Sequence, residues 1–424
     1  MRRFSRGIIT VTPIRISSGW ILLFMLSSLS AQGASLSLDD ALRLAERNAP
    51  SLLAQNEKRA AARSAAIPAG ALPDPKLNLG LQNVPIEGDD RFTTNRDFMT
   101  MQMVGVMQEV PNRDKRKARM ETAQAAVERA DAEAGVERLQ VRSASAQAWI
   151  AAYTLQRKLA LFDDFFRENR LLAASVRARL AGGGASAVDV VAPRQEAALL
   201  DERKDDLLRQ QAQARATLKR WTGEDAPDAL DGDFPHWTID AAHSRQALRR
   251  HPALAAYDPM TREAEALVRE AVAEKKPDWS WELDYQRRSR EFGDMMTLQV
   301  SFDLPLFSAT RQDPKIAARR AQVRQLEAER AAMTREYEQR LESDLAEYRR
   351  LQRALERSTA TLLPLAEEKV RLALAGYRAG TLDLEQLLGA RQQRVEAQLR
   401  QIDLQGSLAQ LAARLYFTYE EGRA

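Results

Sequence analysis

Hydrophobic and polar residues alternate with a period of two in four short segments of the chain. These segments cover about residues 75–83, 98–110, 278–286 and 295–304. Such alternation predicts β-strands with one apolar and one polar face. Their length, about nine residues, matches strands that cross a bilayer at a tilt. We therefore expect two pairs of membrane strands, each joined by a polar loop.

The apolar positions of these segments are predicted to face lipid. They are Leu77, Leu79, Leu81, Met99, Met101, Met103, Trp279, Trp281, Leu298, Val300 and Phe302. The methionines allow a second interpretation, because thioethers are soft ligands that suit Cu(I). We prefer lipid contact, since the three methionines alternate with Thr100 and Gln102 and so occupy the apolar side of the predicted strand.

Between the two strand pairs the pattern becomes helical. Residues 112–181 contain no proline and only one glycine, and the glycine run 182–184 is followed by a second helical segment to residue 221. A continuous helix of this kind would be roughly 105 Å long at about 1.5 Å per residue. Helices far longer than those of globular proteins indicate a coiled coil or a helical array. The pattern thus predicts a long antiparallel helical hairpin.

The same order of elements recurs about two hundred residues later. Pro252 stands in the second copy where Pro50 stands in the first, and Pro305 ends a strand as Pro111 does. A second long helical pattern covers residues 315–363, and Gly376 and Gly380 mark its turn. Such self-similarity predicts repeat architecture. We expect a first structural repeat at residues 35–225, a linker at 226–242 and a second repeat at 243–424.

Residues 1–34 have the layout of a secretory signal. Four arginines precede or flank the short apolar core at 20–29, and small residues follow at 31–34. An uncleaved anchor is the alternative. Without these four arginines the chain has 59 basic and 59 acidic residues, so no basic surplus favours nucleic acid as a partner. The sequence has no cysteine, which excludes disulfides, thiol chemistry and a lipid anchor on an N-terminal cysteine.

The fold class expected from these patterns is mainly helical with membrane β-strands. One chain supplies four strands, and an open strand edge cannot be satisfied inside a bilayer. Closed membrane barrels begin at about eight strands, so several copies must pool their strands. A periplasmic coiled-coil adaptor or scaffold is the alternative of another class. An adaptor should carry one helical hairpin between β-rich domains, whereas this sequence duplicates the hairpin and the strand pair.

Two segments around the first strand pair carry a resemblance to a known family. LPDPKLNLGLQNVPIEGDD and RDFMTMQMVGVMQEVPNRDKRKAR are similar to the TolC family of trimeric outer-membrane efflux channels, in the branch that serves heavy-metal pumps of the RND type. In that branch the strand-to-helix junction commonly reads Gln-Glu-x-Pro and then a Lys-Arg pair. Gln108–Pro111 and Lys115–Arg116 match, while Asp114 replaces the glycine that commonly precedes the pair.

The resemblance implies a homotrimer with a twelve-stranded barrel in the outer membrane of a Gram-negative bacterium and a long helical tunnel through the periplasm. A periplasmic adaptor, the membrane fusion protein, and an inner-membrane RND pump would be its partners. The expected function is a passive, gated duct that exports heavy-metal cations. Export of drugs or other organic molecules and type I secretion are the alternatives within the same class.

The resemblance also places a periplasmic tip at the turns 181–187 and 377–382. Well-known members narrow this mouth with two aspartates, and the corresponding positions here are Gln386 and Gly389. Other residues near the turns could form the gate instead: Asp189, Arg194, Tyr377, Arg378, Asp383, Glu385, Gln386 and Arg391. The plainer interpretation treats them as the surface of a helix end, with Asp383 acting only as an N-cap.

Residues that could support catalysis or bind a cofactor do not form a recognisable pattern. His236, His243 and His251 are seven and eight residues apart, which does not give the i, i+4 geometry of a helical metal pair. A structural or exposed role is expected for them. The glycine run 182–184 lacks the Lys-Ser/Thr of a phosphate-binding loop. The sequence therefore predicts neither an enzyme nor a cofactor.

Overall fold

The computed structural model describes residues 35–223, 227 and 229–420. The predicted signal at residues 1–34 lies outside the described residues. The first half of the chain contains α1 (Leu38–Asn48), α2 (Pro50–Ala66), β1 (Lys76–Gln82), β2 (Met101–Val110), α3 (Arg113–Ala160), α4 (Phe162–Ala181), the 3₁₀ turn η1 (Val188–Val190) and α5 (Ala192–Thr222). The second half contains α6 (Ala241–Leu248), α7 (Pro252–Ala255), α8 (Tyr257–Ala273), β3 (Trp279–Arg287), β4 (Met295–Phe302), α9 (Gln312–Arg357), the π-helical turn η2 (Ser358–Leu362), α10 (Leu363–Ala379), α11 (Leu384–Leu415) and the π-helical turn η3 (Tyr416–Glu420).

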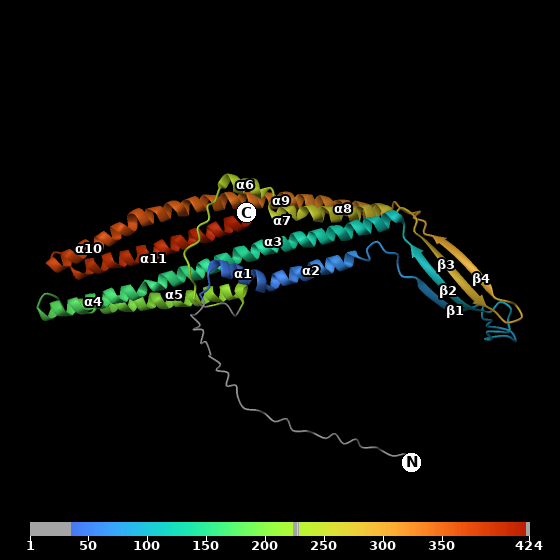
Figure 1. Ribbon diagram of the computed structural model, residues 1–424, viewed down its shortest axis with the longest axis horizontal. Helices are drawn as coiled ribbons and strands as arrows, with labels where there is room; N and C mark the ends of the chain where they lie inside the picture. The colour runs from blue at the N-terminus through green and yellow to red at the C-terminus, as the bar shows by residue number, and fades with distance from the viewer. Residues whose placement is uncertain (1–34, 224–226, 228, 421–424) are drawn as a thin grey trace, which may run out of the picture. The chain divides into compact units, whose positions relative to one another are not determined.

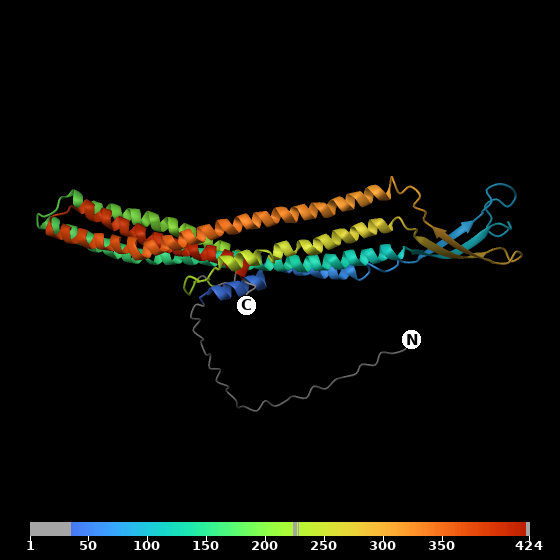
Figure 2. The same cartoon turned by 90° about the horizontal axis from the view of Figure 1, so that it is seen from above.

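Both halves use the same order of helix, strand pair and long helical hairpin. The four strands form one antiparallel sheet in the order β1-β2-β3-β4, so β1 and β4 each keep one unpaired edge. Within residues 35–424 the sheet lies at one end of the long helices, and the turns of both hairpins lie at the other end (Figures 1 and 2). The mainly helical fold class with one strand pair per half is confirmed.

The bounds of three elements differ from the predicted ones. The second strand begins at Met101 rather than near residue 98, because Asp97 accepts hydrogen bonds from the backbone of Met99 and Thr100 and closes a turn there. The helix predicted for 112–181 is divided at Leu161 into α3 and α4. The helical pattern predicted for 315–363 is also divided, because α9 ends at Arg357 and the π-helical turn η2 follows it. Pro364 then lies in the first turn of α10, where its missing N–H is tolerated.

The sheet joins the helices through a proline and a capped helix start. Pro111 follows the last residue of β2 and cannot extend the ladder. The Asn112 side chain then accepts a hydrogen bond from the backbone N–H of Lys115 at 2.9 Å and caps α3. Among the described helices, none is both long and apolar enough to cross a membrane.

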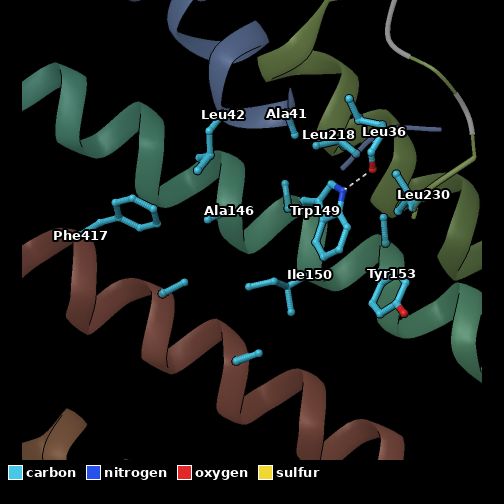
Figure 3. Packing of buried hydrophobic residues seen from close by; sticks show 14 residues of the cluster. Leu36, Ala41, Leu42, Ala146, Trp149, Ile150, Tyr153, Leu218, Leu230 and Phe417 are labelled. Atoms are coloured by element: carbon cyan, nitrogen blue, oxygen red, sulfur yellow. Dashed lines mark hydrogen bonds between the residues drawn. The ribbon is translucent and has the colours of Figure 1, made fainter. Parts of the chain in front are cut away.

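The main hydrophobic cluster lies where α1, α3, α5 and α11 meet, near the middle of the long helices (Figures 1 and 3). Trp149 is 1% exposed, stacks on Tyr153 with ring centroids 4.9 Å apart, and donates a hydrogen bond from Nε1 to the carbonyl of Leu36 at 2.9 Å. Leu36 also forms a parallel bridge with Leu230. Leu230 is buried, so part of the predicted linker packs into this core.

Gly406 in α11 allows a close approach between α11 and α3. A Cβ at this position would lie 2.2 Å from Oγ1 of Thr154. Overpacking of this kind forces helices apart, so we expect Gly406→Ala to lower the free energy of unfolding by about 1–3 kcal/mol. Thermal or urea unfolding in detergent measures the change.

Gly135 in α3 provides the matched control for that variant. It is also helical and exposed, and a Cβ there would meet nothing within 4 Å. We expect Gly135→Ala to leave stability unchanged or to raise it by up to about 1 kcal/mol, because alanine favours the helix. Equal destabilisation by both variants would contradict the close-approach account.

Candidate functional sites: the sheet faces and the helical tip

The register of the sheet places an almost continuous apolar surface on one face, which we call the apolar face. Residues directly opposite each other in antiparallel strands share a face, and successive residues alternate. Leu79 lies opposite Val104, Val104 opposite Tyr285, and Tyr285 opposite Met296. The apolar members of this face are Leu77, Leu79, Leu81, Val104, Val106, Val110, Trp279, Trp281, Leu283, Tyr285, Met296, Leu298, Val300 and Phe302.

The other face, which we call the polar face, carries amides, hydroxyls, charged groups and methionines. Its members are Lys76, Asn78, Gly80, Gln82, Met101, Met103, Gly105, Met107, Glu109, Ser280, Glu282, Asp284, Gln286, Met295, Thr297, Gln299 and Ser301. Lys76 pairs with Glu109, and Asn78 donates to Glu282 at 2.5 Å. The side chains on this face therefore interact across strands and carry a net negative charge.

The register does not place all the residues predicted to face lipid on one face of the sheet. Leu77, Leu79, Leu81, Trp279, Trp281, Leu298, Val300 and Phe302 share the apolar face. Met101 and Met103 lie on the polar face, and Met99 lies in the turn before β2. The reason is that Val104 and Val106, and not the methionines, lie opposite the leucines of β1.

Asp278 forms a polar clamp where the sheet meets the helices. Its Oδ1 accepts hydrogen bonds from the backbone N–H of Asn112 at 2.7 Å and from the Asn112 side chain at 2.9 Å, and its Oδ2 accepts from Lys115 Nζ at 2.6 Å. Burial alone would raise the pKa of Asp278, but the bonds from Lys115 and Asn112 outweigh it and lower the pKa below 3.8. The clamp ties the start of β3 to the start of α3.

This lowered pKa predicts how the stability of the clamp depends on pH. A carboxylate with a lowered folded-state pKa stabilises the fold fully above its unfolded pKa and loses that contribution as pH falls through the folded pKa. We expect Asp278→Asn to lower the free energy of unfolding by about 1–3 kcal/mol at pH 7 and pH 5. The difference in unfolding free energy between the variant and the unchanged protein should become smaller only below about pH 3.8. Urea unfolding at pH 7, 5 and 3 measures it.

The pair of Asp114 and Lys276 serves as the control for this prediction. Asp114 also has a lowered pKa, caused first by its hydrogen bond with Lys276, but the pair is exposed. Exposed ion pairs contribute little to stability, so Asp114→Asn should leave the unfolding curve nearly unchanged. If the stability difference between Asp278→Asn and the unchanged protein already becomes smaller between pH 7 and pH 5, the Asp278 clamp is not the cause of that difference.

The turns of the two hairpins, residues 182–187 and 380–383, form what we call the helical tip. Asp383 caps α11 by accepting a hydrogen bond from the backbone N–H of Gln386 at 2.7 Å, and Oε1 of Gln386 accepts one from the backbone N–H of Asp383 at 3.4 Å. This capping box confirms the N-cap interpretation of Asp383. Gly380 has a positive φ of 76° and ends α10 in the left-handed conformation that glycine favours.

Tyr377 connects the two hairpins at the helical tip. The guanidinium of Arg179, at the end of α4, lies 4.4 Å from the centroid of the Tyr377 ring, and its Nη1 donates to the Tyr377 carbonyl at 2.6 Å. Tyr377 itself is 6% exposed and packs with Leu172, Val176 and Leu387. The contact therefore holds α4 of the first half against α10 of the second.

Two partly buried ion pairs also cross between the halves. Arg391 of α11 donates from Nε to Oε1 of Glu196 in α5 at 3.2 Å, and the two side chains are only 11% and 19% exposed. Arg394, one helical turn further, pairs with Glu168 of α4. Sequence reasoning identified Arg391 and Tyr377 but missed Arg179, Glu196, Arg394 and Glu168. For the two ion pairs the only signal was opposite charge on helices of unknown register, and for Arg179 the sequence carried no signal.

The other predicted tip residues do not come together in one cluster. Asp189 closes its own turn by accepting from the backbone N–H of Ser186 at 2.7 Å. Arg194, Arg378, Glu385 and Gln386 are exposed on the helix surfaces. The structure therefore assembles Tyr377 and Arg391 into the contact between the hairpins and leaves the remaining candidates on the surface of one copy.

His251 is buried between α7 and the aromatic rings of Tyr337 and Tyr419. Its Nδ1 accepts a hydrogen bond from the backbone N–H of Ala253 at 3.2 Å and caps α7. Burial lowers the pKa of His251 to about 4, so the ring is neutral at physiological pH. In the described part of the chain, no group of three or more His, Cys, Asp or Glu side chains is placed to hold a metal ion.

Comparisons with known proteins agree with this architecture. A family model described as outer membrane efflux protein matches residues 41–224 and 244–418. Similar solved structures include a membrane protein from Pseudomonas aeruginosa, with 19% identity, a TM-score of 0.78 and coverage of 90% of this chain and 92% of that chain. VceC from Vibrio cholerae has 16% identity, a TM-score of 0.74 and coverage of 90% and 95%.

CusC has 15% identity, a TM-score of 0.77 and coverage of 90% of this chain and 91% of its own. Identities at this level show a shared fold. A comparison with curated protein sequences finds no match. The family model covers most of both halves, including all four strands and both hairpins. The chain therefore belongs to the outer membrane efflux protein family.

Proposed function

We propose that this protein is the outer-membrane duct of a three-part efflux system of the RND type, and that it exports heavy-metal cations passively from the periplasm to the exterior. The observation that carries the proposal is the two-faced sheet at one end of the long helices. An apolar face suits contact with lipid, whereas the polar face suits a water-filled lumen. The energy for transport comes from the partner pump.

The open edges of the sheet support assembly of three copies. β1 and β4 each keep a row of unpaired backbone groups, which a bilayer cannot satisfy. Pairing β4 of one copy with β1 of the next removes every edge once the ring closes. Three copies supply twelve strands, which lies within the range of known outer-membrane barrels.

The helices carry the duct away from the membrane. The 48 residues of α3 alone extend roughly 72 Å at about 1.5 Å per residue. The helical tip then lies far from the sheet, where a periplasmic adaptor and an inner-membrane pump reach it. A groove of about 610 Å³ between α5 and α11 offers the adaptor a mixed surface, with apolar residues such as Leu199 and Leu388 beside charged ones such as Glu202 and Arg203.

Two observations support cations as the cargo. The junction after β2 resembles the heavy-metal branch of the family, as described above. The polar face also carries Glu109, Glu282 and Asp284 against the single lysine Lys76, so each copy adds a net negative charge to the lumen. A ring of such charge raises the local concentration of cations. Organic cargo is the alternative that the experiment must exclude.

Fractionation of cells that express the full chain, followed by the mass of the complex in detergent, tests the duct. A trimer that is sensitive to heat and lies in the outer-membrane fraction is expected. A soluble periplasmic monomer would contradict the proposal and favour an adaptor or scaffold. Deletion of the gene, scored by growth on copper, silver, zinc, cobalt and cadmium and on a panel of drugs, tests the cargo. Sensitivity to drugs alone would replace metals with organic molecules.

A further inference from the structure

Every large apolar side chain on the polar face of the sheet is a methionine. Met101, Met103 and Met107 come from β2 and Met295 comes from β4. No leucine, isoleucine, valine or aromatic residue shares this face, although the opposite face uses them throughout. A lining that needed only hydrophobic bulk would not be restricted to one residue type. The feature that separates methionine from leucine is its thioether sulfur.

Asp284 lies on the same face, in the row between Met103 and Met107. Gly105 occupies the β2 position between the two methionines and lies opposite Asp284 in β3. A Cβ on Gly105 would lie 1.8 Å from Oδ1 of Asp284, so the carboxylate occupies the space that the glycine leaves. Same-face residues of one strand are about 6.8 Å apart, which spaces the ligands along the strand.

The Asp284 carboxylate has an unsatisfied oxygen. Asp284 is only 7% exposed, and its Oδ1 accepts no hydrogen bond within the described residues. A buried polar atom without a partner is costly. Because Oδ1 lies against Gly105, a rotation of the side chain is needed to bring this oxygen to a cation on the polar face. Glu282, the next residue on this face of β3, already accepts a hydrogen bond from Asn78 and is the neighbour of Met107 across the strand pair.

Met103 lies next to the second glycine of this face, Gly80. Met103 lies opposite Gly80 of β1, and the terminal methyl of Met103 would be 3.5 Å from a Cβ built on that glycine. This is an ordinary van der Waals distance, so the end of the Met103 side chain lies over β1, and Met103 is partly exposed. Gly105, by contrast, leaves space that the carboxylate of Asp284 occupies.

From this arrangement we propose that the polar face is a transit surface for a soft monovalent cation, Cu(I) or Ag(I), with the thioethers of Met101, Met103 and Met107 and the carboxylate of Asp284 as successive ligands. The inference rests on the proposed function, because it requires the polar face to line the lumen. Soft thioethers favour Cu(I), whereas Zn²⁺ and Co²⁺ are bound mainly by thiolates, imidazoles and carboxylates. Several weak ligands in a row let the ion enter and leave again, as conduction requires.

Silver binding and export by the full-length protein test the inference. Ag⁺ is the probe, since it is soft and stable in air, and Zn²⁺ and Co²⁺ are the comparison ions. We expect the triple variant Met101→Leu, Met103→Leu, Met107→Leu to lower Ag⁺ affinity in detergent at least tenfold and to raise silver retained by cells. Asp284→Asn should weaken Ag⁺ binding as well. Zn²⁺ and Co²⁺ should bind the triple methionine variant as they bind the unchanged protein.

Met295 and Met296 supply the matched control, because they are neighbours in the chain on opposite faces of the sheet. Met296→Leu should leave silver binding unchanged, and Met295→Leu added to the triple variant should lower it further. An equal loss in dye or drug export by the triple variant would overturn the inference and make the methionines an adaptable lining for organic cargo.

The outcomes separate this inference from the proposed function. If the triple variant forms trimers and exports silver normally, the thioethers are not ligands and the inference fails, while the duct stands. If the unchanged protein forms an outer-membrane trimer but supports export of zinc or cobalt and not silver, the cargo is a harder cation and the inference again fails. If the unchanged protein forms no outer-membrane trimer, the proposed function fails with it.

Discussion

Leu298→Arg is expected to prevent stable insertion of the sheet into a bilayer. Leu298 is 69% exposed at the middle of β4 and shares the apolar face with Leu283. An arginine that faces lipid at the midplane of a membrane barrel costs roughly 2–4 kcal/mol. Three copies would bring the cost to roughly 6–12 kcal/mol for a trimer. We expect the variant to be lost from the outer-membrane fraction and to fold poorly into lipid vesicles.

Gln299→Arg is the matched control, because Gln299 is the next residue in β4 and lies on the polar face opposite Glu282. An arginine there meets water and a carboxylate, so we expect normal trimer yield and normal insertion. The two variants have the same charge and differ by one position in the strand. If both insert equally well, the apolar face does not contact lipid and the assignment of the two faces is wrong.

The positions of the strands could be read from the sequence because prolines and polar loops bound them. Pro75 precedes β1, Pro111 follows β2 and Pro277 precedes β3 by two residues. Each of these residues removes a ladder donor and therefore stops a strand at a position that can be located in advance. The start of β2 was misplaced by three residues, since the Asp97 turn has no proline or glycine to mark it. The end of β4 was misplaced by two residues, because the strand stops at Phe302 before Pro305 is reached.

The face of β2 could not be read in the same way, because both of its sides are apolar in part. Met101, Met103 and Met107 alternate with Val104, Val106 and Val110, and the polar residue Gln102 on the valine side made the methionine side look more apolar. Only the register with Leu77 and Leu79 decides which set continues the apolar face. Register is a property of two strands, and a one-residue slip would exchange the faces.

The contacts at the helical tip were harder to predict than the faces of the sheet, because they join residues nearly two hundred positions apart in the sequence. Arg391 and Glu196 pair only when α11 and α5 have the right rotation and the right axial offset. The repeat does not identify the pair. Arg194-Gln195 in the first half corresponds to Arg391-Gln392 in the second, yet Arg194 is exposed. With 63 basic and 59 acidic residues in the chain, opposite charge alone cannot select a pair.

Glu196→Gln is expected to loosen the helical tip and to make the duct leak. Removal of one partner leaves the charge of Arg391 buried without its carboxylate, which costs roughly 3–5 kcal/mol for a buried pair and about 3 here, since Glu196 retains some exposure. Arg391 would then move toward water and separate α11 from α5. We expect cells with this variant to become sensitive to vancomycin, and single-channel conductance at rest to rise. Glu385→Gln, at an exposed position of the same tip, should change neither.

The double variant Glu196→Leu, Arg391→Met decides what the ion pair contributes. Replacing a buried pair by apolar residues of similar volume is often neutral or stabilising, because no charge remains to be desolvated. If packing between the hairpins closes the duct, the double variant should return the conductance at rest to its original low value and restore the vancomycin resistance that Glu196→Gln loses. A double variant that leaks as much as the single one would show that the ion pair itself holds the hairpins together, and that neutralising it is sufficient to open the tip.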